Sequence, residues 1–574
     1  MSRKLIDKIR HRLAAESGAV THPWEGRYRV ALIYPNTYRQ GMSNLGFLSV
    51  YQLINQRDDC LCERFFLPDE DDRSEYQRSG FPLVSLESQR PLRDFDLIAL
   101  SISFENDYLN LPTLFSLADI PLFADKRDQS FPLVLFGGVC AFLNPEPLAE
   151  IVDLVAVGEA EPILPKLLTC LLQGNGARES LLHELAGLPG IYLPRFYDCT
   201  YRDDGTIGDY SSAAAVGKQV RRQYLNDLDS SASRSFIQTE ETEFGDMALC
   251  EVSRGCTRGC RFCAAGYIYL PFRQRSLANL LEQVDVGLCR RQKIGLVAAA
   301  VADYAEIAPL QQGILQRGGK VSVSSLRLDA LTAEEVAGMR ESGLRTAAIA
   351  PEAGSQRMRN LINKRLDEEQ ILHAVQLLAA GDILNLKLYF LIGLPTEEQN
   401  DLDELVALAE KIRLLWREAG RKRGRMGMLT LSVNPFIPKP FTPLQWGGMD
   451  GEKSLKKKIR FLRAAVARMP NTKLISESIR SSVLQAFLSR GDRRIAQLLP
   501  GLSAGGNLKQ LCKKAGLDLN FYVTRERGEN ELFPWEVIDQ GIRRDYLWQE
   551  YQRALAGSLT PPCFPGCRRC GICS

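Results

Sequence analysis

The hydrophobic residues of this chain fall into two series of short apolar runs, with stretches of helical periodicity between the runs. In the first series each run ends in a polar or glycine turn, and the runs are 29–34, 97–101, 133–136 and 154–157. Runs that are apolar throughout are typical of strands buried on both faces of a parallel sheet. Their alternation with helices predicts a doubly wound α/β domain over residues 27–170.

The second series begins at Met247 and is more regular. Its apolar runs are 248–252, 295–301, 320–324, 346–350, 386–391 and 428–433. Helical patterns lie between them at 276–290, 306–316, 332–341, 367–380 and 398–416. The third helix carries Thr332 and Glu335 at the spacing of a capping box. Six strands alternating with helices predict a partial (β/α)6 barrel over residues 246–445.

The rest of the chain is less regular. Residues 1–26 predict a short amphipathic helix with an irregular lead-in, and the short polar runs of 171–245 indicate a connecting segment. Four prolines within 435–443 exclude a regular ladder or helix, so this stretch is expected to cross the barrel mouth in an extended conformation. Residues 446–574 predict a mainly helical C-terminal region.

Ligands of doubly wound sheets and of barrels bind beyond the carboxyl ends of the strands. In the first domain this rule selects the loops 38–44, 101–106, 137–138 and 158–159. In the second domain it selects the residues that follow the first strand, 256–263.

Composition narrows the class of protein. The 574 residues carry 72 Lys and Arg against 69 Asp and Glu, and the net charge of +3 gives no case for a polyanionic partner. The first eight residues are too charged for a signal peptide, and no apolar stretch is long enough to cross a bilayer. We therefore expect a cytoplasmic protein without membrane association. Seven of the 15 cysteines lie in two tight groups, which in a reducing compartment favours metal over disulfides.

The first group is Cys256, Cys260 and Cys263. Three thiols at spacings of three and two residues can bind one side of a small iron–sulfur cluster and leave one iron without a protein ligand. An open metal position favours a catalytic cluster over a structural one. Zinc, or an unligated group of core cysteines, is the alternative. Zinc prefers a fourth protein ligand, and the four histidines, at positions 11, 22, 183 and 373, are all distant in sequence.

The second group lies at the end of the chain and comprises Cys563, Cys567, Cys570 and Cys573. Four thiols so close together encircle one metal centre more readily than they form two relaxed disulfides. The spacing predicts an auxiliary iron–sulfur cluster, with a zinc site of four cysteine ligands as the alternative.

The Cys-x3-Cys-x-aromatic-Cys pattern of 256–263 resembles the signature of the radical S-adenosylmethionine (SAM) superfamily. The resemblance implies a 4Fe-4S cluster whose open iron binds SAM, and a 5′-deoxyadenosyl radical formed by reductive cleavage of SAM. It also implies an electron donor such as flavodoxin or ferredoxin, and an anaerobic or microaerobic host.

The same resemblance suggests contacts to SAM around the barrel mouth. Phe262 would pack beside the cluster near the adenine, and Gly393 would supply a backbone contact to it. The superfamily's Gly-Gly-Glu-like segment is replaced by 298–304, where Asp303 is the acceptor left for the ammonium group. Ser325 and Arg327 follow the third strand, where the guanidinium would pair with the SAM carboxylate.

Three further positions complete this set. Glu352, after the fourth strand, would accept hydrogen bonds from the ribose hydroxyls. Arg273 and Arg275 would cover the open face of the cluster, unless they are ordinary surface charges. Each residue in both sets could instead be a capping or core residue.

The first domain resembles the cobalamin-binding domain that often precedes a radical SAM barrel, on the basis of Gly137-Gly138, 144–147 and 158–161. Glycines there would let the backbone approach a flat macrocycle. The Asp-x-His-x-x-Gly motif that supplies a cobalt ligand in many such domains is missing, so a bound cobalamin would lack a histidine on its lower face. A Rossmann-like domain without the cofactor is the alternative.

Together these motifs resemble an uncharacterised bacterial radical SAM family with a cobalamin-binding-like N-terminal domain and a C-terminal cysteine cluster. The resemblance implies a cobalamin-dependent methyltransferase acting on an unknown substrate. Cobalamin-independent rearrangement, sulfur insertion and RNA modification are the alternatives, as is a redox or cluster-carrier protein. The basic runs 421–425 and 456–458 keep nucleic acid open as a partner, although the neutral total does not favour it.

Overall fold

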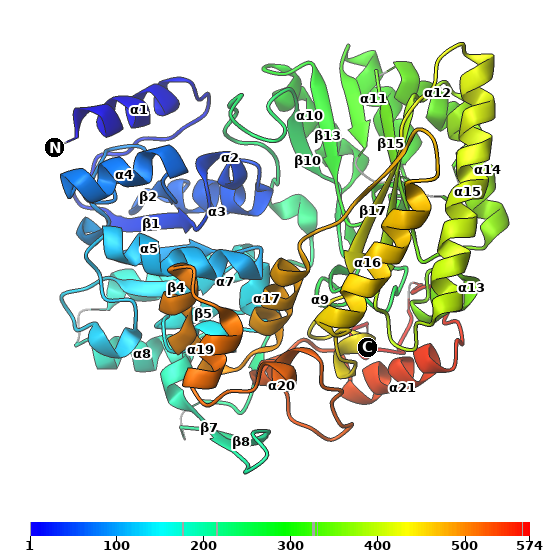
Figure 1. The fold of residues 1–574 in the computed structure, drawn as a ribbon. Helices are drawn as coiled ribbons and strands as arrows, with labels where there is room; N and C mark the ends of the chain where they lie inside the picture. The colour runs from blue at the N-terminus through cyan, green and yellow to red at the C-terminus, as the bar shows by residue number, and fades with distance from the viewer. Residues whose placement is uncertain are drawn as a thin grey trace.

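The computed structural model describes residues 2–174, 177–213, 216–323, 326, 328–329, 331–341, 343–564 and 566–573. The described chain forms two α/β units that lie side by side, and the C-terminal segment packs against both (Figure 1). The first unit is blue to cyan in Figure 1, the second is green to yellow, and the C-terminal segment is orange to red. Among the described helices, none is both long and apolar enough to span a membrane.

The first unit is built on a six-stranded sheet with the order β2-β1-β3-β4-β5-β6. Its first five strands are parallel, and β6 is antiparallel to β5. The strands are β1 Tyr28–Tyr34, β2 Cys60–Phe66, β3 Leu97–Ser101, β4 Leu133–Gly137, β5 Leu154–Ala156 and β6 Ile191–Tyr192. All four predicted strands are present, whereas β2 and β6 were not predicted.

The helices of this unit are α1 Arg3–Ala14, α2 Tyr38–Gly41, α3 Leu45–Asn55, α4 Glu70–Ser79, α5 Leu111–Leu117, α6 Val139–Leu143, α7 Ala160–Gln173 and α8 Arg178–Ala186. Helix α7 continues past residue 170, and β6 adds a strand to the sheet beyond it. The expected boundary at 170 is therefore too early, because the stretch predicted to connect the units begins with elements of the first unit. The hairpin of β7 Tyr197–Tyr201 and β8 Ile207–Ser212 follows.

The second unit contains two parallel sheets, with the orders β10-β13-β14 and β15-β16-β17-β18. The strands are β10 Ala248–Glu251, β13 Lys293–Val297, β14 Lys320–Val323, β15 Thr346–Glu352, β16 Asn385–Ile392, β17 Leu429–Pro435 and β18 Thr472–Ile475. All six predicted strands occur. Strand β18 is a seventh, parallel to β17, in a region that was predicted to be mainly helical.

The intervening helices are α9 Ala265–Ile268, α10 Leu277–Leu288, α11 Ile307–Gln316, α12 Ala333–Glu341, α13 Gln356–Leu361, α14 Glu368–Ala380, α15 Gln399–Lys422 and α16 Glu452–Val466. The capping box before α12 is confirmed. The Thr332 amide donates to Glu335 Oε2 over 2.9 Å, and the Glu335 amide donates to Thr332 Oγ1 over 3.2 Å.

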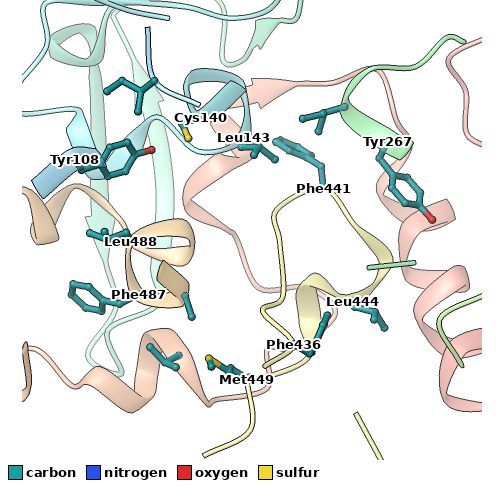
Figure 2. Packing of buried hydrophobic residues seen from close by; sticks show 14 of the residues in the cluster. Tyr108, Cys140, Leu143, Tyr267, Phe436, Phe441, Leu444, Met449, Phe487 and Leu488 are labelled. Carbon is teal, nitrogen blue, oxygen red and sulfur yellow. The ribbon is translucent and has the colours of Figure 1, made fainter. Parts of the chain in front are cut away.

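The C-terminal segment joins the two units. Its helices are α17 Ile479–Arg490, α18 Leu499–Ser503, α19 Leu508–Lys514, α20 Leu519–Val523 and α21 Arg544–Leu555. One hydrophobic core runs through all three parts. Figure 2 shows Leu143 of the first unit beside Phe441 of the extended segment, and Tyr108 of the first unit on the same side as Phe487 and Leu488 of α17. The short strands β9 Val220–Arg221 and β19 Ile538–Asp539 pair with each other as a further link.

Candidate functional site

The three barrel cysteines lie on a loop that a short ladder closes at its base. Strand β11, Ser253–Arg254, pairs antiparallel with β12, Arg273–Gln274, and the loop between them carries Cys256, Cys260, Cys263 and α9. Gly255 has a φ of 86°, and a Cβ there would lie 2.8 Å from the Tyr269 carbonyl oxygen, so this turn requires glycine. The loop starts two residues after β10, at the carboxyl end of the sheet.

The donor set of this loop fits an iron–sulfur cluster. All three cysteines are unpaired and half-buried, and their charges influence one another. Burial raises the pKa of each thiol, to about 12 for Cys260, while backbone N–H groups directed at Cys256 and Cys263 oppose the rise. Thiols in such surroundings need a cationic centre in order to ionise, and N–H groups directed at sulfur stabilise the bound thiolates.

The cysteine sets differ from a site for a single ion. In the part of the chain that the structure describes, no three His, Cys, Asp or Glu side chains are grouped around one metal-ion position. A four-iron cluster requires another arrangement, because each thiolate binds a different iron atom at a separate corner.

The SAM contacts predicted from the sequence lie in three different settings. Asp303 forms an ion pair with Arg258 of the cysteine loop, with an Oδ1 to Nη2 distance of 2.6 Å, so this carboxylate holds the loop. Phe262 is half-buried and packs against the main core. The Gly393 amide donates to Glu397 Oε2 over 2.7 Å. Ser325 and Arg327 lie outside the described residues.

Glu352 is the predicted contact with the most unusual backbone. It ends β15 in the left-handed region, with a φ of 66°, which is strained for a residue with a side chain. Its carboxylate pairs with Lys364 over 3.3 Å, and both side chains are largely buried. Burial raises the pKa of Glu352 against the effect of Lys364. The cysteine loop is close, because the charges of Cys260 and Cys263 act on Lys364. The sequence gave no reason to select Lys364.

A cavity of about 790 Å³ lies between the two units. Residues of all four loops selected in the first unit line it, together with the segment Ala298-Ala299 and the start of the cysteine loop. These lining residues are Ser43, Asn44, Ser101, Ser103, Gly137, Gly138, Gly158, Glu159, Arg254, Gly255 and Ala265. The carboxyl ends of the first unit's sheet and of the β10-β13-β14 sheet therefore open into one common space. Its volume is within the range of about 300–1,000 Å³ that is typical of small-molecule and cofactor sites.

A buried charge network at the edge of this cavity joins the units. Arg254 contacts Glu159 and Glu161 of the first unit, each at 2.7 Å, and Glu251 of β10 at 3.0 Å. Arg273 binds the second oxygen of Glu159 at 2.7 Å. All these side chains are at most 19% exposed. Arg254 directly precedes Gly255-Cys256, so the network fixes the cysteine loop relative to the first unit.

The network also revises the role expected for Arg273 and Arg275. Both side chains are buried, and Arg275 pairs with Glu251 at 3.1 Å. They are therefore not surface charges. Their described ion-pair partners are carboxylates of the chain itself, and both also donate to backbone carbonyls. Arg254 was missed in the sequence because its partners Glu159 and Glu161 are more than 90 residues away.

The terminal cysteines lie next to the same loop. The Cys563 amide donates to the Thr257 carbonyl over 2.8 Å. A second, much smaller cavity is lined by Cys256 and Thr257 and by the tail residues Cys563, Cys567 and Cys570. The structure thus brings the two predicted metal sites together, although 300 residues separate them in sequence.

The fold and the site define an α/β protein with a thiol-rich loop at the carboxyl end of a parallel sheet. A sequence model described as "Radical SAM superfamily" matches residues 250–409, and one described as "Radical SAM proteins, N-terminal" matches residues 46–194. An uncharacterised protein of Methanocaldococcus jannaschii is 30% identical over 501 residues, which is 86% of this chain and 96% of that protein. The chain belongs to the radical SAM superfamily.

Two more distant likenesses were found. The anaerobic magnesium-protoporphyrin IX monomethyl ester cyclase of Rubrivivax gelatinosus is 23% identical over 295 residues, which is 48% of each chain. A solved structure of the cobalamin-dependent S-adenosylmethionine radical enzyme OxsB, with aqua-cobalamin and S-adenosylmethionine bound, is 14% identical with a TM-score of 0.47. It covers 92% of this chain and 79% of that chain.

Superfamily membership confirms the broad part of the sequence prediction. It implies an enzyme with a 4Fe-4S cluster and SAM. The extensive relative is archaeal, so the expected restriction to a bacterial family is not supported. The N-terminal match extends to residue 194 and thus includes β6, in agreement with the observed extent of the first sheet.

Proposed function

We propose that this protein is a radical SAM methyltransferase that binds cobalamin in the cavity between its two α/β units. The observation that carries the proposal is the single cavity of about 790 Å³ into which the ligand-binding ends of both sheets open. Cys256, Cys260 and Cys263 would hold the cluster, whose chemistry with SAM generates the 5′-deoxyadenosyl radical. Cobalamin would supply a methyl group for transfer to an unactivated carbon of the substrate.

The glycines of the cavity wall fit a flat macrocycle at one position. A Cβ at Gly138 would lie 2.5 Å from the Ile102 carbonyl oxygen, and a Cβ at Gly158 would lie 2.0 Å from the Gln223 carbonyl oxygen. Close packing within the chain therefore requires glycine at both positions. A Cβ at Gly137 would have its nearest neighbour, the Leu100 carbonyl oxygen, at 3.7 Å. Glycine at 137 is thus not required by the chain itself, and it keeps the cavity wall open.

The other lining residues determine how a ligand would be held. Apolar side chains from the first unit, such as Leu45, Leu135 and Val139, would exclude water from one face of a bound ring. Serines at 43, 101 and 103 offer hydroxyl groups at its rim. No described residue of the lining is a histidine.

Retention of cobalamin tests the proposal. After anaerobic incubation with hydroxocobalamin and gel filtration, the wild type is expected to keep about one cobalt per chain. Gly137→Leu is expected to reduce retention at least about tenfold, because the new side chain occupies cavity volume that the ring requires. Gly338→Leu, the same change on the exposed face of α12, is the matched control and is expected to bind like the wild type. A wild type that retains no cobalt would refute cobalamin dependence and favour hydrogen abstraction without cobalamin.

We also propose that Glu352 binds the ribose hydroxyls of SAM. Glu352→Gln preserves the shape and removes the charge of the acceptor, so we expect SAM to bind about 10-fold more weakly, which corresponds to the loss of about 1.5 kcal/mol from a charge-assisted hydrogen bond. Titration of SAM into the anaerobic protein measures the Kd. Glu341→Gln, at an exposed position in α12, controls for the substitution.

A second variant separates binding from local folding. Lys364→Gln breaks the same buried ion pair but keeps the Glu352 carboxylate. If Lys364→Gln weakened SAM binding as much as Glu352→Gln while Glu352 remained ionised, the ion pair would be structural and the proposed ribose contact would be wrong.

One of the sequence-based alternatives, modification of RNA, fits the geometry less well. RNA modification would require a basic surface near the site. The basic run 421–425 lies between the end of α15 and the start of β17, at the amino ends of the barrel strands and thus opposite the site. Lys456 and Lys458 are paired with acidic residues.

A further inference from the structure

The last residues of the chain are built into the cysteine loop. Besides the hydrogen bond from Cys563 to Thr257, the Thr560 amide donates to Asn363 Oδ1 over 3.0 Å, and Asn363 Nδ2 donates to the Gly259 carbonyl over 3.1 Å. Asn363 therefore links the tail to the turn between Cys256 and Cys260. These contacts fix the position of the tail relative to the loop.

A buried arginine reinforces the connection. Arg261 lies inside the cysteine loop with no exposed surface, and its Nη2 donates to the Ser558 carbonyl over 2.8 Å. Its Nε donates to Glu550 Oε2 on α21 over 3.1 Å, and Glu550 in turn accepts from Thr560 Oγ1. Because Arg261, Glu550 and Thr560 are buried, this junction is a defined part of the fold.

The four tail thiols are neighbours. The charges of Cys567, Cys570 and Cys573 all act on the Cys563 thiol, and Cys567 and Cys570 are buried. Arg569 Nε donates to Cys567 Sγ over 3.2 Å. The Nη1 of Arg569 is buried and has no hydrogen-bond partner among the described residues. A half-buried guanidinium with an unused N–H group beside thiols is suited to an anionic sulfur-containing centre.

The tail extends from the cysteine loop to the protein surface. Cys563 and Cys567 share the small cavity with Cys256, whereas Cys573 at the other end of the set is exposed. Phe564 is 59% exposed, and Arg568 is exposed as well. A centre held by these four thiols would have one side against the catalytic loop and one side accessible to a partner protein.

We propose that Cys563, Cys567, Cys570 and Cys573 bind a second iron–sulfur cluster through which electrons enter the catalytic loop. The proposal of a metal site depends only on the tail residues, whereas the proposal of an electron relay also depends on the proposed radical chemistry. A low-potential carrier protein of the flavodoxin or ferredoxin class gives up one electron, and the tail centre passes one electron on, so that it returns to its initial oxidation state. That electron breaks the S–C5′ bond of SAM and yields methionine and the 5′-deoxyadenosyl radical.

Zinc would not serve this role, because Zn²⁺ has no accessible redox change. Soft thiolate sets accept either zinc or iron–sulfur clusters, so the ligands alone do not distinguish the two. The position between the surface and the cysteine loop is what favours the cluster.

Metal analysis tests the site. The variant in which all four tail cysteines are alanine is expected to contain about four irons fewer per chain than the wild type after anaerobic reconstitution. The complementary variant, with alanine at 256, 260 and 263, is expected to keep about four irons and to show the electron paramagnetic resonance signal of a reduced cluster. Cys289→Ala removes an exposed cysteine that belongs to neither group. It is the control and is expected to keep all the iron.

The relay is tested by comparing two reductants. With dithionite, which reaches the catalytic site as a small molecule, the tail variant is expected to form 5′-deoxyadenosine at a rate within about threefold of the wild type. With flavodoxin, its reductase and NADPH, the same variant is expected to be at least about tenfold slower. The variant that retains dithionite activity has thereby also shown that its catalytic loop is folded.

Several outcomes would overturn the proposal. Unchanged iron in the tail variant, or loss of one zinc instead of iron, would refute the second cluster. If the rate of the tail variant, as a fraction of the wild-type rate, were the same with flavodoxin as with dithionite, the relay would be refuted. A wild type that forms no 5′-deoxyadenosine with either reductant would refute the proposed function. The iron contents of the two variants would still show whether the tail cysteines bind a cluster.

Discussion

The variant with alanine at Cys256, Cys260 and Cys263 is expected to lose about four irons per chain, whereas the wild type is expected to bind about eight. The three thiols are the cysteines of the loop at the carboxyl end of β10, and backbone N–H groups are directed at two of them. Without thiolates the loop offers no soft ligands, so the cluster that binds SAM cannot form. Iron and acid-labile sulfide, measured on the anaerobically purified protein, give the result.

A matched control separates this effect from a general loss of structure. Cys512→Ala removes a buried cysteine of α19, distant in sequence from both cysteine groups, and is expected to retain all the iron. If the triple variant kept its full iron content, the barrel cysteines would not be cluster ligands.

Arg254→Ala is expected to have the second largest effect, a loss of roughly 3–5 kcal/mol in the free energy of unfolding. Arg254 is 11% exposed and binds carboxylates from both units. Glu159 and Glu251 keep Arg273 and Arg275 as partners, but Glu161 has no other ion pair in the described part of the chain. Chemical denaturation under anaerobic conditions measures the change, and we expect iron retention to fall as well, because Arg254 is two residues from Cys256.

A double-mutant cycle identifies the cause. Glu161→Ala in the Arg254→Ala background removes the uncompensated buried charge, so we expect the double variant to be more stable than Arg254→Ala alone. Arg78→Ala breaks an ion pair on α4 in which the arginine is 75% exposed, and is expected to leave the unfolding transition unchanged. Additive effects of the two substitutions would contradict the role assigned to the Arg254–Glu161 pair.

Much of the fold was predictable because its signals are local. Ten strands coincide with apolar runs, and the capping box before α12 is encoded by two residues three apart. The cysteine loop was equally accessible, since its spacing and its place after the first barrel strand both lie within a few residues.

Strand β2 was missed for a physical reason. Its centre holds Glu63 and Arg64, and a charged pair in a run of seven residues does not indicate a buried strand. In the structure Arg64 has no exposed side-chain surface and pairs with Glu16 and Glu87, which lie 48 and 23 residues away. The charges are tolerated because of partners that no local pattern reveals.

The same limit applies to the site. The loops around the cavity were predictable, because ligands bind beyond the carboxyl ends of parallel strands. The junction between the two units was not predictable from the sequence. Arg254 meets Glu159 and Glu161 across the domain interface, and Cys563 meets Thr257 across more than half of the chain. The sequence predicted both cysteine groups separately, and only the tertiary structure shows that they are adjacent.

The central claim is that the barrel cysteines support reductive cleavage of SAM, and the formation of 5′-deoxyadenosine tests it most directly. Reconstituted wild type, incubated anaerobically with SAM and dithionite, is expected to release 5′-deoxyadenosine and methionine in equal amounts. The variant with alanine at 256, 260 and 263 is expected to release neither above the level without enzyme. A fully reconstituted wild type that leaves SAM intact, or a triple variant that cleaves it like the wild type, would contradict the account.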